Sequence, residues 1–260
     1  MPSSASRGIA IADARDDNFQ FAPEFYRTVI VPCFPPDELE TEEELIGGLR
    51  SGRSRLLLAK DADGTIVGGA VGDYFPRSDV MLLAYLAVRP GGRGSGIGST
   101  LLQAARDAWM AELNPRLIVL EVEDPRGVTG SAEFGDPVAR VRFYERYGVR
   151  ALPLPYVMPA LSPGGQRVQR LMLMVLGGAA VPPGSATADG QHVASFVAEY
   201  FEEFEGPARP GDSELGLLLA ACARPGGLPL LRADELPAVN QRRGGSSYDQ
   251  VAHAVPGTAP

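Results

Sequence analysis

The sequence predicts an α/β fold, in which a mostly antiparallel sheet is flanked by helices and followed by a helical C-terminal appendage. Short apolar runs between turn residues indicate strands, and a longer stretch of apolar residues at helical spacing follows them. The strands are predicted at 55–60, 65–72 and 81–88, and the helix at 98–113. The composition then changes at Gly177. We therefore expect a frayed N-terminus at 1–8 and a main domain over 9–177.

Composition places the chain among ordinary globular proteins. Its 260 residues are 45% hydrophobic and 22% charged, with a formal net charge of −8. The negative charge argues against nucleic-acid binding and agrees with a cationic small substrate. Two cysteines and two histidines form no metal-ligand spacing. The sequence shows neither a secretory signal nor an apolar run of the about 20 residues that cross a bilayer, so we expect a cytoplasmic protein without a membrane partner.

The first part of the main domain predicts a broken helical region and a hairpin. Apolar residues recur at helical spacing from Phe19 to Arg50, and three prolines at 32–36 divide this region. The break is either a rigid connector or part of the wall of a substrate pocket. Residues 61–64, Asp-Ala-Asp-Gly, predict the turn between the first two strands, because Asp-Gly accommodates positive φ.

A strand that runs into a glycine-rich turn is the most informative stretch of the chain. The apolar run 81–88 is ended by a proline and two glycines, and Gly94, Gly96 and Gly98 precede the next helix. Glycine lets the backbone approach a ligand, and the first amides of a helix point outward without partners. With the charge of Arg93 they predict a phosphate site, although the glycines could also serve the turn alone. The evenly spaced glycines match neither the P-loop, which needs Lys, nor the dinucleotide motif Gly-x-Gly-x-x-Gly.

The second half of the main domain predicts a further strand and helix. Residues 116–123 alternate as a strand that carries Glu121 and Glu123 on one face. These carboxylates are either catalytic or form the solvated end of the strand. Asp136 and a following proline open a helix that stops at Gly148. Two final strands are predicted at 149–160 and 168–176.

The remaining chain predicts a linker at 178–190, a helical appendage at 191–240 and a disordered tail at 241–260. Apolar residues at helical spacing indicate helices at 192–204 and 212–223. The appendage cannot bury its apolar stripe alone. It therefore docks either on the main domain or on a second copy of the chain, which would form a homodimer.

Two motifs resemble those of the GNAT superfamily of N-acetyltransferases. The first consists of Leu86, Ala87 and Val88, a short turn, and Arg-x-x-Gly-x-Gly at Arg93, Gly96 and Gly98. The second is Phe143-Tyr144 followed by Gly148-Val149 at the end of a helix. The resemblance implies the GNAT fold, with a mixed, mostly antiparallel sheet, and acetyl-CoA as the acyl donor.

The resemblance also implies where the donor binds. The backbone amides that would hold its pyrophosphate belong to Gly94, Ser95, Gly96, Ile97, Gly98 and Ser99. The pantetheine would pair along Leu86, Ala87 and Val88. Two positions depart from the family pattern: Pro137 stands where many members have an Asn that bonds pantetheine, and the connection 124–135 is longer than usual. We expect this insert to form a lid on the acceptor side.

The activity that the resemblance implies is transfer of an acetyl group to a primary amine of a small molecule or peptide, by direct attack in a ternary complex. Tyr144 is the candidate acid for the departing thiolate, and Glu121, followed by Glu123, is the candidate base. The amide of Val88 would stabilise the oxyanion if a bulge freed it from the sheet. Two alternatives stay open: a non-catalytic acyl-CoA-binding sensor, and an acyltransferase that uses a longer acyl-CoA or a protein N-terminus.

Overall fold

A computed structural model describes residues 8–92, 94–128, 130–131 and 134–237. Arg93, almost all of the N-terminus predicted to fray and the tail predicted to be disordered lie outside these residues. None of the helices in the described part of the chain combines the length and the apolarity that a membrane span needs.

The centre of the molecule is a mixed sheet with the strand order β1-β2-β3-β4-β5-β7-β6. All neighbouring strands are antiparallel except β4 and β5, which are parallel. The strands are β1 (Ala10–Asp13), β2 (Ser54–Lys60), β3 (Ile66–Phe75), β4 (Val80–Val88), β5 (Leu117–Glu123), β6 (Arg150–Ala151) and β7 (Leu171–Gly177). This architecture confirms the predicted α/β fold and its mostly antiparallel sheet.

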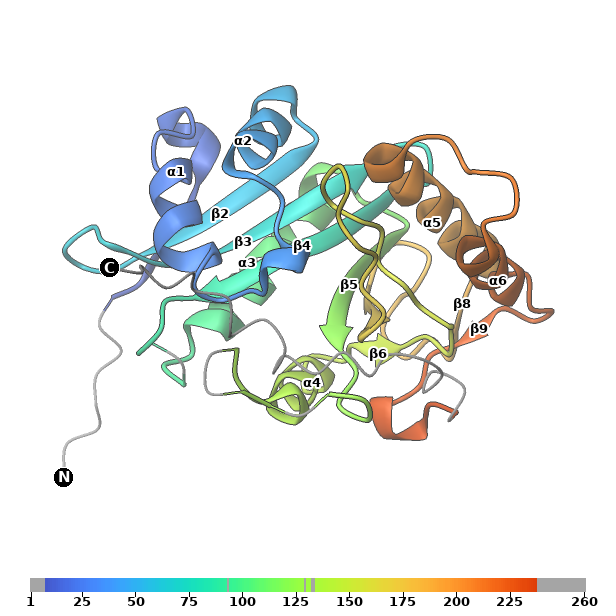
Figure 1. Ribbon diagram of the computed structural model, residues 1–260. Coiled ribbons are helices and arrows are strands. Elements are labelled where there is room, and N and C mark those ends of the chain that lie inside the picture. The colour runs from blue at the N-terminus through green and yellow to red at the C-terminus, as the bar shows by residue number, and fades with distance from the viewer. Residues whose placement is uncertain (1–7, 93, 129, 132–133, 238–260) are drawn as a thin grey trace, which may run out of the picture.

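Helices cover both faces of the sheet (Figure 1). They are α1 (Ala22–Phe25), continued by a π-helical turn (Tyr26–Ile30), α2 (Glu42–Ser51), α3 (Ile97–Glu112), α4 (Pro137–Glu145), α5 (Gly190–Glu205) and α6 (Ser213–Cys222). One core cluster joins α3 and α4 to one face. The opposite face is shared, because α1 and α2 pack on its β2–β4 part and α5 and α6 on its β4–β7 part.

The two parallel strands separate halfway along their length. Residues Val80–Leu83 of β4 pair with Leu117–Leu120 of β5, after which β5 stays with β7 and β4 stays with β3. The edge of β4 over residues 84–88 that faces β5 is therefore unpaired. At the point of separation β4 also bulges: Leu83 lies opposite Gly72 and Tyr85 opposite Val71. Ala84 is the extra residue.

The oxyanion hypothesis required a bulge at Val88, and that position was wrong. Val88 lies opposite Gly68 in regular pairing, and the one register shift between β3 and β4 is at Ala84.

Two strand predictions also differ from the structure. The stretch predicted as a strand at 149–160 forms only the two-residue β6 and two isolated bridges, Ala151 with Leu231 and Met158 with Val168. It contains Pro153, Pro155 and Pro159, which cannot donate to a sheet. Strand β1 was missed, because four residues with one exposed edge give too short a pattern to recognise.

The C-terminal appendage packs on the rest of the same chain. On α5, Val193, Phe196 and Phe201 are buried in a cluster that also contains Phe75 and Leu82 of the sheet. Burial of each large apolar side chain stabilises the fold by about 1.5–3 kcal/mol. Within the predicted linker, β8 (Thr187–Ala188) pairs with β9 (Leu228–Pro229) and so closes the appendage.

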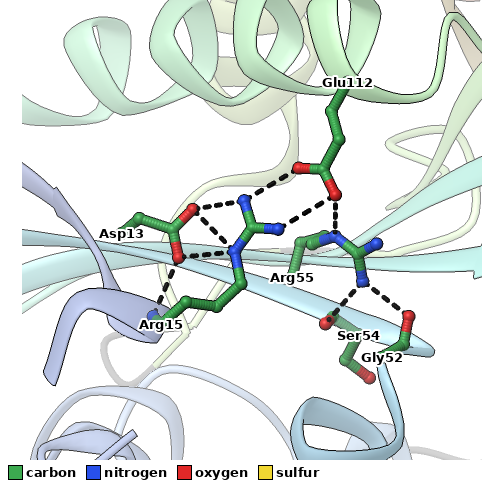
Figure 2. A network of polar contacts seen from close by, with 6 residues as sticks. All are labelled: Asp13, Arg15, Gly52, Ser54, Arg55 and Glu112. Carbon is green, nitrogen blue, oxygen red and sulfur yellow. Dashed lines mark hydrogen bonds and ion pairs between the residues drawn. The ribbon is translucent and has the colours of Figure 1, made fainter. Parts of the chain in front are cut away.

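An ion-pair network ties the first strands to the far end of α3. Figure 2 shows the Arg15 guanidinium between Asp13 and Glu112, with Arg55 of β2 donating to the same Glu112 carboxylate at 2.9 Å. Each such partly exposed pair contributes at most about 1 kcal/mol. Together they fix the C-terminal end of α3, whose other end begins at the glycine-rich turn.

Candidate active site

The glycine-rich turn has the backbone that an anion site requires. Gly94 has φ +83° and Gly96 has φ +87°, a region that side chains with a Cβ rarely adopt. A Cβ built on either glycine meets no atom within 4 Å. These two glycines are therefore needed for the path of the backbone, not for close packing.

The start of α3 leaves its first amides available. Gly96 is the N-cap and has no side chain that could accept a bond from the first amides. The amides of Ile97, Gly98 and Ser99 have no partner within an α-helix, and the helix dipole adds partial positive charge at this end. Residues 94–99 thus suit a phosphate or pyrophosphate group. A Cβ added to Gly98 would lie 3.7 Å from Cγ2 of Val88 and 3.8 Å from Cζ of Phe143, so the turn runs close to both signature motifs.

The unpaired edge of β4 leads from this turn to the middle of the sheet. Leu86 and Val88 pack toward α3 and α4, whereas Ala87 points to the cluster under α1 and α2. Its backbone has no strand partner, so an extended pantetheine chain could pair with it, and only the Val88 carbonyl is contacted, by the Cys33 thiol at 3.5 Å, among the contacts of the described residues. It ends at the bulge of Ala84.

Tyr144 lies on α4, on the same side of the sheet as α3. Its ring packs edge-on against Phe143 at 5.1 Å. Burial raises the pKa of its hydroxyl to about 12, and the charge of Arg140 only partly opposes this effect. The hydroxyl therefore keeps its proton at neutral pH and can act as a donor.

Glu121 projects from β5 on the opposite side of the sheet. The Tyr156 hydroxyl donates to its Oε1 at 2.5 Å, and the Tyr200 hydroxyl donates to its Oε2 at 3.3 Å. Burial is the main cause that raises the pKa of Glu121 to about 7, and the charge of Glu38 adds to it. The hydrogen bonds from the two tyrosine hydroxyls lower the pKa of Glu121 and so oppose this shift. A carboxyl group with this pKa exchanges protons readily near neutral pH.

Glu123 lies two residues further on the same strand but in a different environment. Arg140 of α4 donates to it at 2.9 Å, and Nε of Arg170 lies 3.8 Å away. The buried Glu123 carboxylate is therefore engaged by two guanidinium groups rather than open to the pocket. Its contacts instead connect the end of β5 to α4.

A small pocket of about 40 Å³ opens beside Glu121. Its wall combines carboxylates with aromatic rings, together with Ala84 at the bulge. The lining includes Phe34, Glu38, Glu40, Asp73, Ala84, Tyr85, Glu121, Tyr200 and Phe204. Phe34 belongs to the proline-rich break, which is therefore part of a pocket wall. None of the described residues of 124–135 lines this pocket, and Arg126 bonds the carbonyls of Leu236 and Pro237; a lid formed by this insert stays a prediction.

The pocket carries more acidic than basic groups. Glu40 pairs with Arg53 at 2.9 Å and Glu38 pairs with Arg170, whereas no cation contacts Glu121 among the described residues. Burial raises the pKa of Glu38 to about 7 and also raises the pKa of both Glu40 and Asp73. A cation that enters this pocket would replace protons and restore the charged form of the carboxylates.

Several of these residues escaped the sequence analysis. Tyr156 falls in the stretch predicted as a strand at 149–160 and Tyr200 in the helix predicted at 192–204, and no local pattern marks Glu38, Glu40 or Asp73. One signal was available for Tyr200: a tyrosine in a stripe of phenylalanines carries a hydroxyl that needs a partner when buried.

Comparison with known proteins found one family model and a number of solved structures. Residues 22–148 match a family model described as the acetyltransferase (GNAT) family. A search of curated proteins gave no match. The solved structures with a similar fold include a GNAT-family protein from Bacteroides thetaiotaomicron, with 24% identity, TM-score 0.47, and coverage of 66% of this chain and 87% of that chain.

Two further solved structures are of named N-acetyltransferases. The ribosomal-protein-S18-alanine N-acetyltransferase of Escherichia coli is 17% identical (TM-score 0.45; 65% of this chain, 93% of that chain). The spermidine/spermine N-acetyltransferase SpeG of Vibrio cholerae is 15% identical (TM-score 0.43; 66% of this chain, 94% of that chain).

Proposed function

Residues 22–148 belong to the GNAT acetyltransferase family, and from this premise we propose that the chain transfers an acetyl group from acetyl-CoA to a primary amine of a small cationic molecule. The pocket beside Glu121 is the observation that carries the acceptor assignment. It brings four carboxylates and several aromatic rings to the point where β4 separates from β5. Acidic and aromatic groups together favour an ammonium ion.

The donor would lie on the other side of this opening. The amides of residues 94–99 would bind its pyrophosphate, and the unpaired edge of β4 over Leu86, Ala87 and Val88 would pair with its pantetheine. The thioester would then reach the bulge at Ala84, which also lines the acceptor pocket. Donor and acceptor would meet there from opposite faces of the sheet.

The chemistry is a direct attack in a ternary complex. Glu121 takes a proton from the bound ammonium ion, and the freed amine attacks the thioester carbon. The new C–N bond forms, the C–S bond breaks, and Tyr144 protonates the departing thiolate. The ammonium ion loses two protons in the whole reaction. One of them makes up for the proton that Tyr144 gives to the thiolate, and the other leaves to solvent. Holding both reactants at one point supplies a further part of the acceleration.

We assign Glu123 a supporting role rather than that of a base. Its ion pair with Arg140 holds α4, and therefore Tyr144, against the end of β5, and Arg170, just before β7, lies on its other oxygen.

The test is acetyl-CoA-dependent thiol release against a panel of polyamines, aminoglycosides, amino acids and short peptides. We expect release with small primary amines that carry positive charge, and a loss of about 10²-fold or more in kcat/KM for Glu121→Gln. Glu112→Gln, on the surface network of Figure 2, is the matched control and should keep full activity. Binding of acetyl-CoA without release against any amine would favour the sensor alternative. Release confined to peptides with a free N-terminus would favour a protein acceptor.

A further inference from the structure

The C-terminal helix α5 reaches the proposed acceptor site although it lies outside the matched residues 22–148. Two of its side chains, Tyr200 and Phe204, line the pocket beside Glu121. Their neighbour across the pocket is the loop after α1, which contributes Phe34 and Glu38. The acceptor pocket is therefore enclosed between the N-terminal region and the appendage.

Tyr200 contacts the candidate base itself. Its hydroxyl donates to one carboxylate oxygen of Glu121 at 3.3 Å, while Tyr156 donates to the other at 2.5 Å. Tyr200 is almost fully buried, with 3% of its surface exposed. Because each oxygen has its own donor, the plane of the carboxylate is fixed relative to the pocket.

The position of Tyr200 is fixed from the sheet. The buried carboxylate of Glu199, the preceding residue, accepts the backbone amides of Arg77 at 3.1 Å and Ser78 at 2.8 Å. These amides belong to the turn between β3 and β4. The Tyr200 ring also packs edge-on against Phe75 at 5.4 Å, at the end of β3. These contacts of α5 leave the Tyr200 hydroxyl little freedom to move.

We propose that Tyr200 is a positioning residue, which together with Tyr156 orients the Glu121 carboxylate toward the acceptor amine, so that the appendage completes the active site. This inference rests on the proposed function of the same site. The titratable groups that face Glu121 are Tyr156, Tyr200 and Glu38, with Glu40, Asp73 and Tyr85 further around the pocket.

Removal of the hydroxyl should change how Glu121 titrates. A donor to a carboxylate favours its charged form, so Tyr200→Phe should raise the pKa of Glu121. The acid limb of kcat/KM should move to higher pH, with a severalfold loss at pH 7 that recovers at higher pH. Tyr156→Phe should move the limb further, because its contact is shorter. Tyr74→Phe, which removes a hydroxyl that bonds Asp79 outside the pocket, should leave the limb in place.

A double-mutant cycle gives a second readout. Tyr200 acts through Glu121, so Tyr200→Phe should cost little further kcat/KM once Glu121→Gln is present. Equal losses in both backgrounds would overturn the inference.

A measurement that needs no acceptor separates this inference from the proposed function. In protein labelled with ¹³C at the glutamate carboxyl carbon, the Glu121 resonance is identified by its loss in Glu121→Gln. Its titration midpoint should rise in Tyr200→Phe, whose ring keeps the packing and whose thermal unfolding confirms the fold. An unmoved midpoint in the folded variant would overturn the inference. If the midpoint rises but no amine is acetylated, the proposed function fails and the contact between Tyr200 and Glu121 stands.

Discussion

At the scale of single residues, Gly96 is the position where the backbone most clearly requires glycine. Its φ of +87° and the open space at its Cβ position identify a conformational role next to the first amides of α3. Gly96→Glu should weaken acetyl-CoA binding at least tenfold, because it distorts the turn and places a negative charge where phosphate would bind. Calorimetric titration with acetyl-CoA measures the change.

The matched control for this substitution is Gly64→Glu. Gly64 has φ +81° and equally open surroundings, but it lies in the hairpin turn between β2 and β3. Both variants therefore carry a similar backbone strain of about 1–2 kcal/mol, and only Gly96→Glu should lose affinity. Equal affinities would remove the glycine-rich turn from the donor site.

Tyr144 makes a separate prediction about the leaving group. Tyr144→Phe keeps the ring that packs against Phe143 and removes only the buried hydroxyl. Turnover should fall about tenfold or more, while the affinity for acetyl-CoA stays nearly constant. Tyr147→Phe, on the same helix end and in contact with the same ring, is the control. Undiminished turnover in Tyr144→Phe would show that solvent protonates the thiolate.

At the scale of elements, one buried carboxylate adds a polar anchor to the apolar packing of α5 on the sheet. Glu199→Ala leaves the amides of Arg77 and Ser78 without their acceptor, at a cost of about 1–3 kcal/mol in the free energy of unfolding. Glu202→Ala, one helical turn on, removes only an exposed ion pair with Arg77 and should cost less than about 1 kcal/mol. Urea unfolding compares the two; equal costs would show that Glu199 does not anchor the helix.

The elements differ in how far the sequence could predict them, because only features set by neighbouring residues leave a pattern in the sequence. The strand–turn–helix from β4 to α3 was placed within one residue, because apolar period, proline and glycine all act over neighbouring residues. Glu121 was found by strand alternation for the same reason. Its partners Tyr156 and Tyr200 lie 35 and 79 residues further along the chain, and only the folded structure brings them together. The bulge at Ala84 likewise follows from pairing with β3 and not from a local pattern.

At the scale of the whole molecule, the acidic pocket has a stability consequence. Burial raises the pKa of Glu121 to about 7, above its value in the unfolded chain, so the folded state binds more protons between about pH 4.5 and pH 7. The contribution of Glu121 to stability is therefore present below about pH 4.5 and is lost as the pH rises through about 7. The pKa of Glu38 is also raised by burial, so its contribution to stability changes with pH in the same direction.

The direction of this change in stability with pH can be measured by denaturant unfolding at pH 5 and pH 8. The free energy of unfolding of the wild type should fall, relative to that of Glu121→Gln, by an amount on the order of 3 kcal/mol as the pH rises. Glu112→Gln should show no such difference, since Glu112 is partly exposed and paired with arginines. A pH-independent difference between wild type and Glu121→Gln would contradict the burial of a neutral Glu121.

The account as a whole requires donor and acceptor to meet in one ternary complex, through the opening between β4 and β5. Initial rates measured with acetyl-CoA and the amine both varied test this most directly. We predict intersecting lines in the double-reciprocal plot. We also predict full activity in Cys33→Ala, because direct transfer needs no thiol of the protein, although the Cys33 thiol lies 3.5 Å from the Val88 carbonyl. Parallel lines, together with an acetylated protein that loses its label on addition of the amine, would indicate a covalent intermediate and contradict direct transfer.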